Sequence, residues 1–187
     1  KKKKKRQILI LLGKTAYIGE QELKRKLHDI FYLAEKYHYS IKFKFHPKSI
    51  FSIKQLLKKF NDLKVEESFE SVMSESLNSE VTISTSKTGS CLDSIAVGVP
   101  VIEYYSYGNG IEDNMQNEFK INGKIMSLFK YYNLVESIDS LNDLDLFFDK
   151  INSSKTFTKK IIDQQSQALK KISYNKNKVI KKFLQNF

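Results

Sequence analysis

Short apolar runs of strand length alternate with longer amphipathic segments through most of this 187-residue chain. The first run, Arg6–Leu12, is apolar almost throughout rather than at every second residue, which is typical of a strand buried on both faces. The segment that follows, Gly19–Tyr39, repeats apolar residues every three or four positions and predicts a helix. Because strands that alternate with helices form parallel βαβ units, we expect an α/β fold.

The same patterns extend this prediction along the chain. We expect further strands at Ser40–Phe45, Leu63–Val65, Val81–Ser84, Pro100–Tyr104 and Leu134–Ile138. Further helices are expected at Ser49–Phe60, Phe69–Leu77, Gly89–Val97, Lys124–Tyr132, Ser140–Ile151 and Thr156–Asn186, the last as one helix or two, with an irregular loop at Tyr105–Asn117. The predicted fold is a Rossmann-like parallel sheet with helices on both faces, plus a long C-terminal helix. Residues 1–5 form a basic linker or arm, 6–151 the Rossmann-like domain and 152–187 a C-terminal helical extension.

The positive charge of the chain is unevenly distributed. The net charge of +11 divides into +13 for residues 1–64, −10 for residues 65–150 and +8 for residues 151–187. Such a chain suits nucleic acid, an anionic membrane or a phosphorylated ligand. Only two of the 32 basic residues are arginine, the residue that base readout and bidentate phosphate binding favour, so we do not expect a nucleic-acid partner. The basic face of the terminal helix leaves peripheral contact with an anionic membrane open.

The cellular setting follows from what the sequence lacks. A single cysteine, Cys91, allows no intrachain disulfide and fits a reducing compartment, and its place in a predicted helix favours a small core residue over a nucleophile. No stretch approaches the roughly 20 apolar residues of a membrane span, and no signal peptide follows the basic start. We therefore expect a cytoplasmic protein, with peripheral association at the inner face of the cell membrane left open.

Five hydroxyl side chains lie within the seven residues Ser84–Ser90, between a predicted strand and a predicted helix. One Ser or Thr would suffice as a helix cap, so the excess favours ligand binding. Hydroxyls, Lys87 and the backbone N–H groups at the start of a helix together suit an anion, most often a phosphate. The residues that carry this prediction are Ser84, Thr85, Ser86, Thr88, Gly89 and Ser90.

Two other predicted strands end in residues that suit a phosphate. His46 and Pro47 follow the strand Ser40–Phe45, with Lys48 close by, and an imidazole beside a phosphate donates a hydrogen bond and gains charge near neutral pH. Gly13 and Lys14 follow the first strand, although they lack the spacing of a known phosphate loop. Ligands of parallel sheets bind at the carboxyl ends of the strands, where these residues and the loop after Tyr104 are expected to meet.

Two acidic residues are candidates for binding ribose hydroxyls. Asp93 lies about one turn into the predicted helix, where it would also stabilise the helix dipole, and Glu103 lies near the end of the following strand. The chain has no zinc-binding pattern, no Gly-x-Ser-x-Gly turn and no Cys/His pair, so we expect neither a metal nor a hydrolase site.

These motifs resemble the C-terminal, donor-binding domain of GT-B glycosyltransferases. The resemblance covers roughly residues 6–150 and is carried by a strand that ends in His46-Pro47, the hydroxyl-rich loop, an acidic residue on the next helix and Gly98-Val99-Pro100 before a strand. It is strongest for bacterial surface-polysaccharide enzymes with a His-Pro and a Ser/Thr-rich motif, which include sialyltransferases, polysialyltransferases, capsule Kdo transferases and glycerophosphate polymerases.

The resemblance implies the donor half of an enzyme that transfers a sugar from a nucleotide-sugar to a surface polysaccharide or lipooligosaccharide. His46 would contact the leaving phosphate, Ser84–Ser90 would hold that phosphate, and Asp93 would stand where many relatives carry a ribose-binding glutamate. No cofactor is expected; the donor would be a CMP-sugar first and a UDP-sugar second. The general base would come from an N-terminal acceptor domain. A UDP-GlcNAc 2-epimerase-like enzyme, or a non-catalytic nucleotide- or partner-binding domain, remains the alternative.

Overall fold

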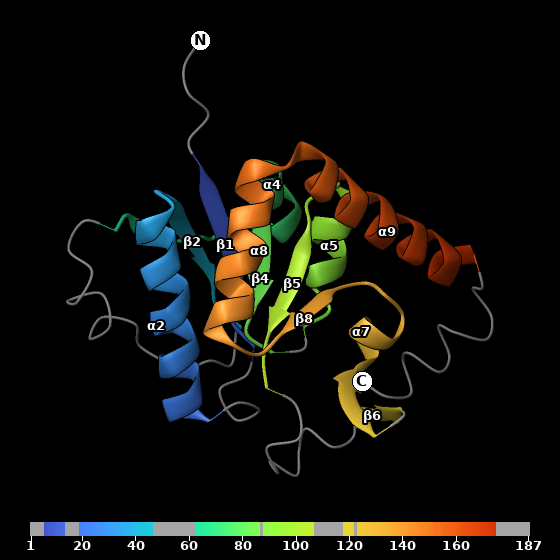
Figure 1. The fold of residues 1–187 in the computed structure, drawn as a ribbon. Coiled ribbons are helices and arrows are strands. Elements are labelled where there is room, and N and C mark those ends of the chain that lie inside the picture. The colour runs from blue at the N-terminus through green and yellow to red at the C-terminus, as the bar shows by residue number, and fades with distance from the viewer. Residues whose placement is uncertain are drawn as a thin grey trace.

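A computed structural model describes residues 6–13, 19–46, 63–86, 88–106, 118–121 and 123–174. It confirms the α/β prediction, with a six-stranded sheet in the order β3-β2-β1-β4-β5-β8 (Figure 1). All neighbouring strands of this sheet run parallel. Its strands are β1 (Gln7–Leu11), β2 (Ser40–Lys44), β3 (Val65–Glu67), β4 (Val81–Ser84), β5 (Val101–Tyr104) and β8 (Glu136–Ile138).

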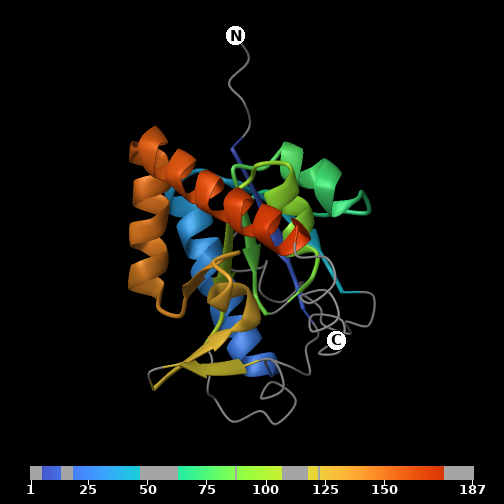
Figure 2. The same cartoon turned by 90° about the vertical axis from the view of Figure 1, so that its right-hand side faces the viewer.

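Helices cover both faces of the sheet. The helices α2 (Glu20–Lys36) and α8 (Leu141–Ser153) lie on one face, and α4 (Val72–Leu77) and α5 (Cys91–Ala96) lie on the other (Figure 1). The last described helix, α9 (Lys155–Tyr174), begins against α8 and continues to α5, so that it crosses one side of the molecule (Figure 2). Among the described helices, none is both long and apolar enough to cross a membrane.

Strand β1 lies in the middle of the core because both of its faces are apolar. Ile8 and Ile10 pack with α2 and α8, whereas Leu9 and Leu11 pack with α5, and all four are at most 3% exposed. Strand β2, nearer the edge, instead alternates between buried and half-buried residues. The continuous apolar run of the first strand thus correctly predicted a strand buried on both faces.

The prediction of a helix over Lys124–Tyr132 is correct only for its second half. Strands β6 (Glu118–Ile121) and β7 (Lys124–Ser127) pair antiparallel in a separate two-stranded sheet, and the short helix α7 (Leu128–Tyr131) follows. The Ser127 hydroxyl accepts a hydrogen bond from the Lys130 N–H and so fixes the helix start at residue 128. The predicted helix at Ser49–Phe60 and the part of Thr156–Asn186 beyond residue 174 lie outside the described residues.

The order of the strands creates a switch point between β1 and β4. From β1 the chain adds β2 and then β3 on one side, and it then returns to place β4 on the other side of β1. Parallel α/β sheets bind ligands at such a point, in the crevice beyond the carboxyl ends of the two strands. Below, the carboxyl edge denotes the edge at which the parallel strands end, and the amino edge the one at which they begin.

Candidate functional site

Gly13 and Ser86 lie against each other at the carboxyl ends of β1 and β4. The N–H of Thr85 donates to the carbonyl of Leu11 over 3.1 Å, which continues the pairing of the two strands. A Cβ atom added to Gly13 would lie only 1.5 Å from Ser86 Oγ. Residue 13 therefore has to be glycine while Ser86 keeps this position, and the Ser86 hydroxyl lies over the end of β1 at the switch point.

The first three hydroxyl residues of the predicted loop are buried at this point. Ser84, Thr85 and Ser86 are at most 2% exposed, and the Ser84 hydroxyl donates to the backbone carbonyl of Ser86. Within the described part of the chain, Thr85 Oγ1 and Ser86 Oγ have no hydrogen-bond partner, as is also true of Thr82 Oγ1 inside β4. A buried hydroxyl without a partner costs about 1 to 3 kcal/mol, so two of them at the switch point indicate a place for an outside polar group.

The second half of the loop is more exposed than the first. Thr88 and Ser90 are half-buried and Gly89 is exposed. The N–H groups of the next three residues donate to the carbonyls of Thr88, Gly89 and Ser90 over 3.0 to 3.2 Å. The N–H groups of Cys91, Leu92 and Asp93 are thus engaged in tight turns before and within α5. Asp93, in the first turn of α5, is exposed.

His46 lies on the same edge as the hydroxyl loop. It is half-buried and follows the last residue of β2, Lys44, by two positions, and β2 is separated from β4 only by β1. With strands about 4.8 Å apart, the ends of β2 and β4 are roughly 10 Å from each other. A phosphorylated ligand can span this distance, so both motifs are placed to contact one molecule. Lys14, Pro47, Lys48 and Lys87 lie outside the described residues.

Glu103 of β5 is buried beneath the carboxyl edge. Its side chain is 0% exposed, and its carboxylate accepts hydrogen bonds from the hydroxyls of Ser127 over 2.6 Å and Ser137 over 3.5 Å. The carboxylate therefore ties β5 to the base of the β6–β7 hairpin, a contact that the sequence did not reveal because this hairpin was not predicted. A role for Glu103 in binding ribose stays a prediction.

The sequence did not predict the buried ammonium group of Lys26 and its partners at the carboxyl edge. The Lys26 ammonium is 0% exposed, donates to the carbonyl of Asp139 over 2.6 Å and lies 3.9 Å from the centre of the Tyr104 ring. Burial lowers the pKa of Lys26 to about 8. The Tyr104 hydroxyl donates to Asp29 over 2.6 Å. The burial of Lys26 could have been predicted from its spacing, because it falls three residues after Leu23 on the apolar face of α2.

Cys91 is a core residue, as predicted. It is 0% exposed within the apolar cluster under α5. Burial raises the pKa of its thiol well above the usual range, so the thiol stays protonated near neutral pH and is a poor nucleophile. Among the described residues, no three His, Cys, Asp or Glu side chains form a group that could hold a metal ion.

The fold is similar to one domain of several solved nucleotide-sugar enzymes. UDP-GlcNAc 2-epimerase from Neisseria meningitidis, solved with UDP-GlcNAc, shares 18% identity at a TM-score of 0.57 over 90% of this chain and 44% of its own. The glycosyltransferase SnogD from Streptomyces nogalater shares 11% identity at a TM-score of 0.57 over 89% of this chain and 40% of its own. The C-terminal CMP-Kdo binding domain of WaaA from Acinetobacter baumannii shares 13% identity at a TM-score of 0.57, over 88% of this chain and 90% of that domain.

These likenesses show the fold. The chain has the Rossmann-like architecture of the C-terminal domains of GT-B glycosyltransferases and related epimerases, and it spans less than half of each of the two longer enzymes. No protein-family model matches the sequence, and a comparison with curated proteins finds no match.

Proposed function

We propose that this chain is the donor-binding half of a GT-B glycosyltransferase that transfers a sugar from a nucleotide-sugar to a bacterial surface polysaccharide or lipooligosaccharide. The observation that carries the proposal is the switch point, where Gly13 lets the β1 end approach β4 and where the buried hydroxyls of Thr85 and Ser86 have no partner among the described residues. Hydroxyl donors held in a water-poor place stabilise a departing phosphate without first having to be reoriented.

Each group at the carboxyl edge has a proposed role. The hydroxyls of Thr85 and Ser86 donate to oxygens of the phosphate, and His46 donates to the same leaving group from the end of β2. Asp93, exposed on α5, accepts hydrogen bonds from the ribose. The general base and the acceptor site come from an N-terminal domain outside this chain. We place the reaction in the cytoplasm, at the inner face of the cell membrane.

A CMP-sugar is our first choice of donor and a UDP-sugar the second. The His-Pro and Ser/Thr motifs favour CMP, and among the similar structures the WaaA domain is described as binding CMP-Kdo. Departure of CMP leaves a single phosphate, which needs fewer groups to hold it than a diphosphate does. Two buried hydroxyls and one imidazole are in keeping with this smaller leaving group.

Calorimetric titration of the chain with CMP, CDP and UDP tests the proposal. CMP should bind, and Ser86→Ala and His46→Ala should each weaken binding at least tenfold while the variants remain folded. His28→Ala, an exposed histidine on α2 away from the carboxyl ends of β2 and β4, is the matched control and should bind as the unmodified chain does. The proposal would be overturned if none of the three nucleotides binds, or if Ser86→Ala and His46→Ala bind CMP as tightly as the unmodified chain does.

An epimerase is the second candidate, because three of the similar structures are epimerases of this type or bind UDP. In that case UDP would bind more tightly than CMP. Joined to its N-terminal half, the enzyme would convert UDP-GlcNAc to its 2-epimer without any acceptor, which proton NMR of the products would detect. If nucleotides bind but neither transfer nor epimerisation occurs, the domain is a non-catalytic binding module.

A further inference from the structure

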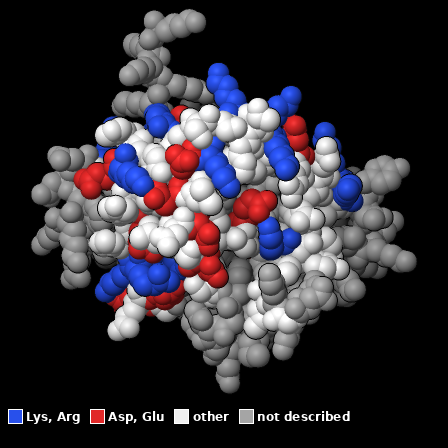
Figure 3. Space-filling view, in the orientation of Figure 1, with Lys and Arg blue, Asp and Glu red and all other residues white. Residues whose placement is uncertain are grey.

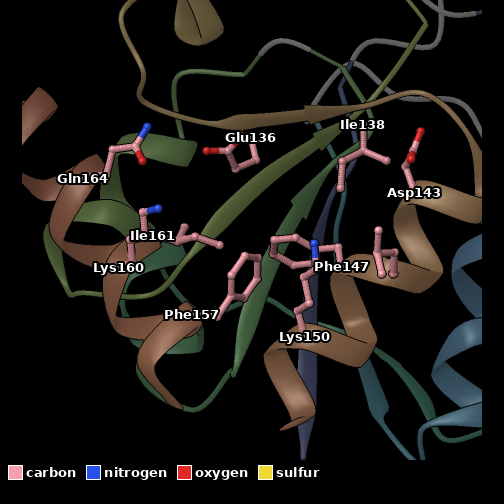
Figure 4. Close-up of a pocket in the computed structure, with 10 residues that line it drawn as sticks. Glu136, Ile138, Asp143, Phe147, Lys150, Phe157, Lys160, Ile161 and Gln164 are labelled. Atoms are coloured by element: carbon pink, nitrogen blue, oxygen red, sulfur yellow. The ribbon is translucent and has the colours of Figure 1, made fainter. Parts of the chain in front are cut away.

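A groove lies between α8, α9 and the edge strand β8, away from the switch point (Figure 4). Each helix contributes residues spaced as i, i+3, i+4 and i+7, which form a single stripe on a helix. The stripe of α8 consists of Asp143, Leu146, Phe147 and Lys150, and that of α9 of Phe157, Lys160, Ile161 and Gln164. Glu136 and Ile138 of β8 complete the groove, whose volume is about 280 Å³.

The floor of this groove is apolar and partly aromatic. The rings of Phe147 and Phe157 meet edge to face with their centres 6.0 Å apart, and Ile161 beside them is only 4% exposed. Leu146 lies at the mouth and is 50% exposed, although it is a large apolar residue. An apolar chain lying in the groove would cover Leu146 and contact both rings, with a favourable free energy of about 25 cal/mol for each Å² removed from water.

The charge of the groove favours an anion. In the described part of the chain, neither Lys150 nor Lys160 has a carboxylate within 4 Å, and the Lys150 ammonium lies 5.7 Å from the centre of the Phe157 ring. Of the two acidic residues in the lining, only Glu136 is paired with a cation among the described residues, whereas Asp143 keeps its charge. Glu136 accepts from Lys130 over 2.8 Å, and Asp143 accepts from the Ser140 hydroxyl over 2.6 Å.

The α9 side of the groove carries the same sign of charge, whereas the sequence of α8 holds three aspartates against one lysine. Basic side chains gather over α9 and its junction with α8, with few acidic ones between them (Figure 3). The sequence of α9 holds five lysines against one aspartate. Such a surface attracts an anionic ligand over roughly a Debye length, about 8 Å at physiological salt.

We propose that this groove binds an amphipathic organic anion, with its hydrocarbon chain on the aromatic floor and its acid group beside Lys150 and Lys160. The volume is at the small end of ligand pockets, which suits a single medium-length chain rather than a fused-ring molecule. The acid group is a carboxylate or a phosphate, carried either by a free acid or by a membrane lipid. The site is separate from the nucleotide site and does not depend on the proposed transferase activity.

Octanoate is the probe, titrated into the ¹⁵N-labelled chain and followed by chemical-shift changes. We expect saturable binding, with the shifts concentrated on β8, α8 and α9. Octanol, which has the same chain without the charge, should bind at least fivefold more weakly, and acetate, which has the charge without the chain, should not bind measurably. CMP should leave the octanoate affinity unchanged, because the two sites are distinct.

Two groove variants test the chain and the charge separately. Leu146→Glu, at a half-exposed position, should abolish octanoate binding, and Lys150→Met with Lys160→Met should weaken it at least fivefold. The matched controls are Leu77→Glu, an exposed leucine of α4, and Lys171→Met, an exposed lysine of α9 outside the groove, and both should bind within twofold of the unmodified chain. Absent binding, shifts centred elsewhere, or groove variants that match their controls would overturn the proposal.

Vesicles distinguish the two sources of the ligand. If the ligand is a membrane lipid, the chain should float with phosphatidylglycerol vesicles but not with phosphatidylcholine vesicles, and Leu146→Glu should abolish the flotation. If the ligand is a free acid, the chain should bind octanoate but float with neither kind of vesicle. Both results support the groove as the site, whereas equal flotation of Leu146→Glu and Leu77→Glu together with unchanged octanoate binding excludes it.

Discussion

The end of β1 at the amino edge and the loop after β4 at the carboxyl edge differ in how fully their buried polar side chains are paired. At the amino edge, the Arg6 guanidinium donates to Glu80, to the Tyr39 hydroxyl, to Asn152 and to the carbonyl of Tyr37. At the carboxyl edge, two buried hydroxyls have no partner in the described part of the chain. This difference agrees with the proposed division of roles, in which the amino edge serves stability and the carboxyl edge binds the ligand. Each prediction below perturbs one edge and asks whether stability or binding responds.

The largest effect on stability is expected at the amino edge, where Gln165 of α9 meets the first residue of β5. The Gln165 side chain accepts from the N–H of Val101 over 3.0 Å and donates to its carbonyl over 2.6 Å, and it is 1% exposed. Gln165→Leu leaves the buried N–H of Val101 without this partner and removes a strong bond from its carbonyl, which should lower the free energy of unfolding by about 3 kcal/mol. Urea denaturation measures this, and the nucleotide affinity of the folded fraction should not change. A loss below 1 kcal/mol would show that water replaces both bonds.

A steric change at the carboxyl edge should come next. Gly13→Ala places a methyl group 1.5 Å from Ser86 Oγ and 2.9 Å from Ser86 Cβ, so the Ser86 hydroxyl must turn away and the ends of β1 and β4 must shift slightly. We expect a loss of about 2 to 3 kcal/mol in the free energy of unfolding, typical of overpacking. Adding Ser86→Gly should restore most of the stability but not nucleotide binding. If the second change restores nothing, the contact between residues 13 and 86 is not the cause of the loss.

The buried ammonium of Lys26 should make stability rise with pH. Its pKa of about 8 lies below the ordinary value of 10.5, so between these values the unfolded chain binds the proton and the folded chain does not. The folded state therefore gains about 2 kcal/mol between pH 8 and pH 10 from this group. The slope is clearest below about pH 9, because unfolded tyrosines, with an ordinary pKa of about 10, ionise at the upper end of the range and oppose it. Thermal unfolding across this range measures the slope, and Lys26→Met should remove it. Lys24→Met, a more exposed lysine of the same helix, should leave the slope in place.

A smaller loss is expected from Arg6, because its side chain is about one-third exposed and water can replace part of its contacts. Arg6→Met keeps the stem of the side chain over the Tyr39 ring, 4.2 Å from the guanidinium carbon, but removes the hydrogen bonds. We expect about 1 kcal/mol less stability and an unchanged nucleotide affinity. Weaker nucleotide binding in this variant would contradict the division of roles between the two edges.

The sequence predicted the layers of the fold better than the contacts at the site. The continuous apolar run of β1 indicated a strand buried on both faces, and the alternation of strands with helices then predicted a parallel sheet. The hydroxyl-rich loop and His46 were correctly expected on one edge, since all parallel strands end on the same side. Placing the site required no more than strand order and strand ends.

What the sequence could not predict depends on contacts between distant residues. The β6–β7 hairpin was missed because a four-residue strand such as Lys124–Ser127 has too few positions to distinguish a period of 2 from one of 3.6. The approach of Ser86 to Gly13 follows from the register of β1 and β4, which local pattern does not fix. Likewise, the pairing of Gln165 with Val101 joins positions 64 residues apart.

The smallest expected change in stability is also the most informative one for function. Ser86→Ala removes a buried hydroxyl that has no partner among the described residues, so the free energy of unfolding should stay within about 0.5 kcal/mol of the unmodified chain or rise by up to about 1 kcal/mol. The same change should weaken CMP binding at least tenfold, because the hydroxyl then no longer meets the phosphate. Ser76→Ala is the matched control, since the Ser76 hydroxyl bonds to Ser94 over 2.7 Å and to the carbonyl of Val72, and it should lose stability without losing affinity. Two variants of one residue type with opposite effects would separate the binding edge from the structural interior, whereas a destabilised Ser86→Ala that binds normally would assign this hydroxyl to the fold.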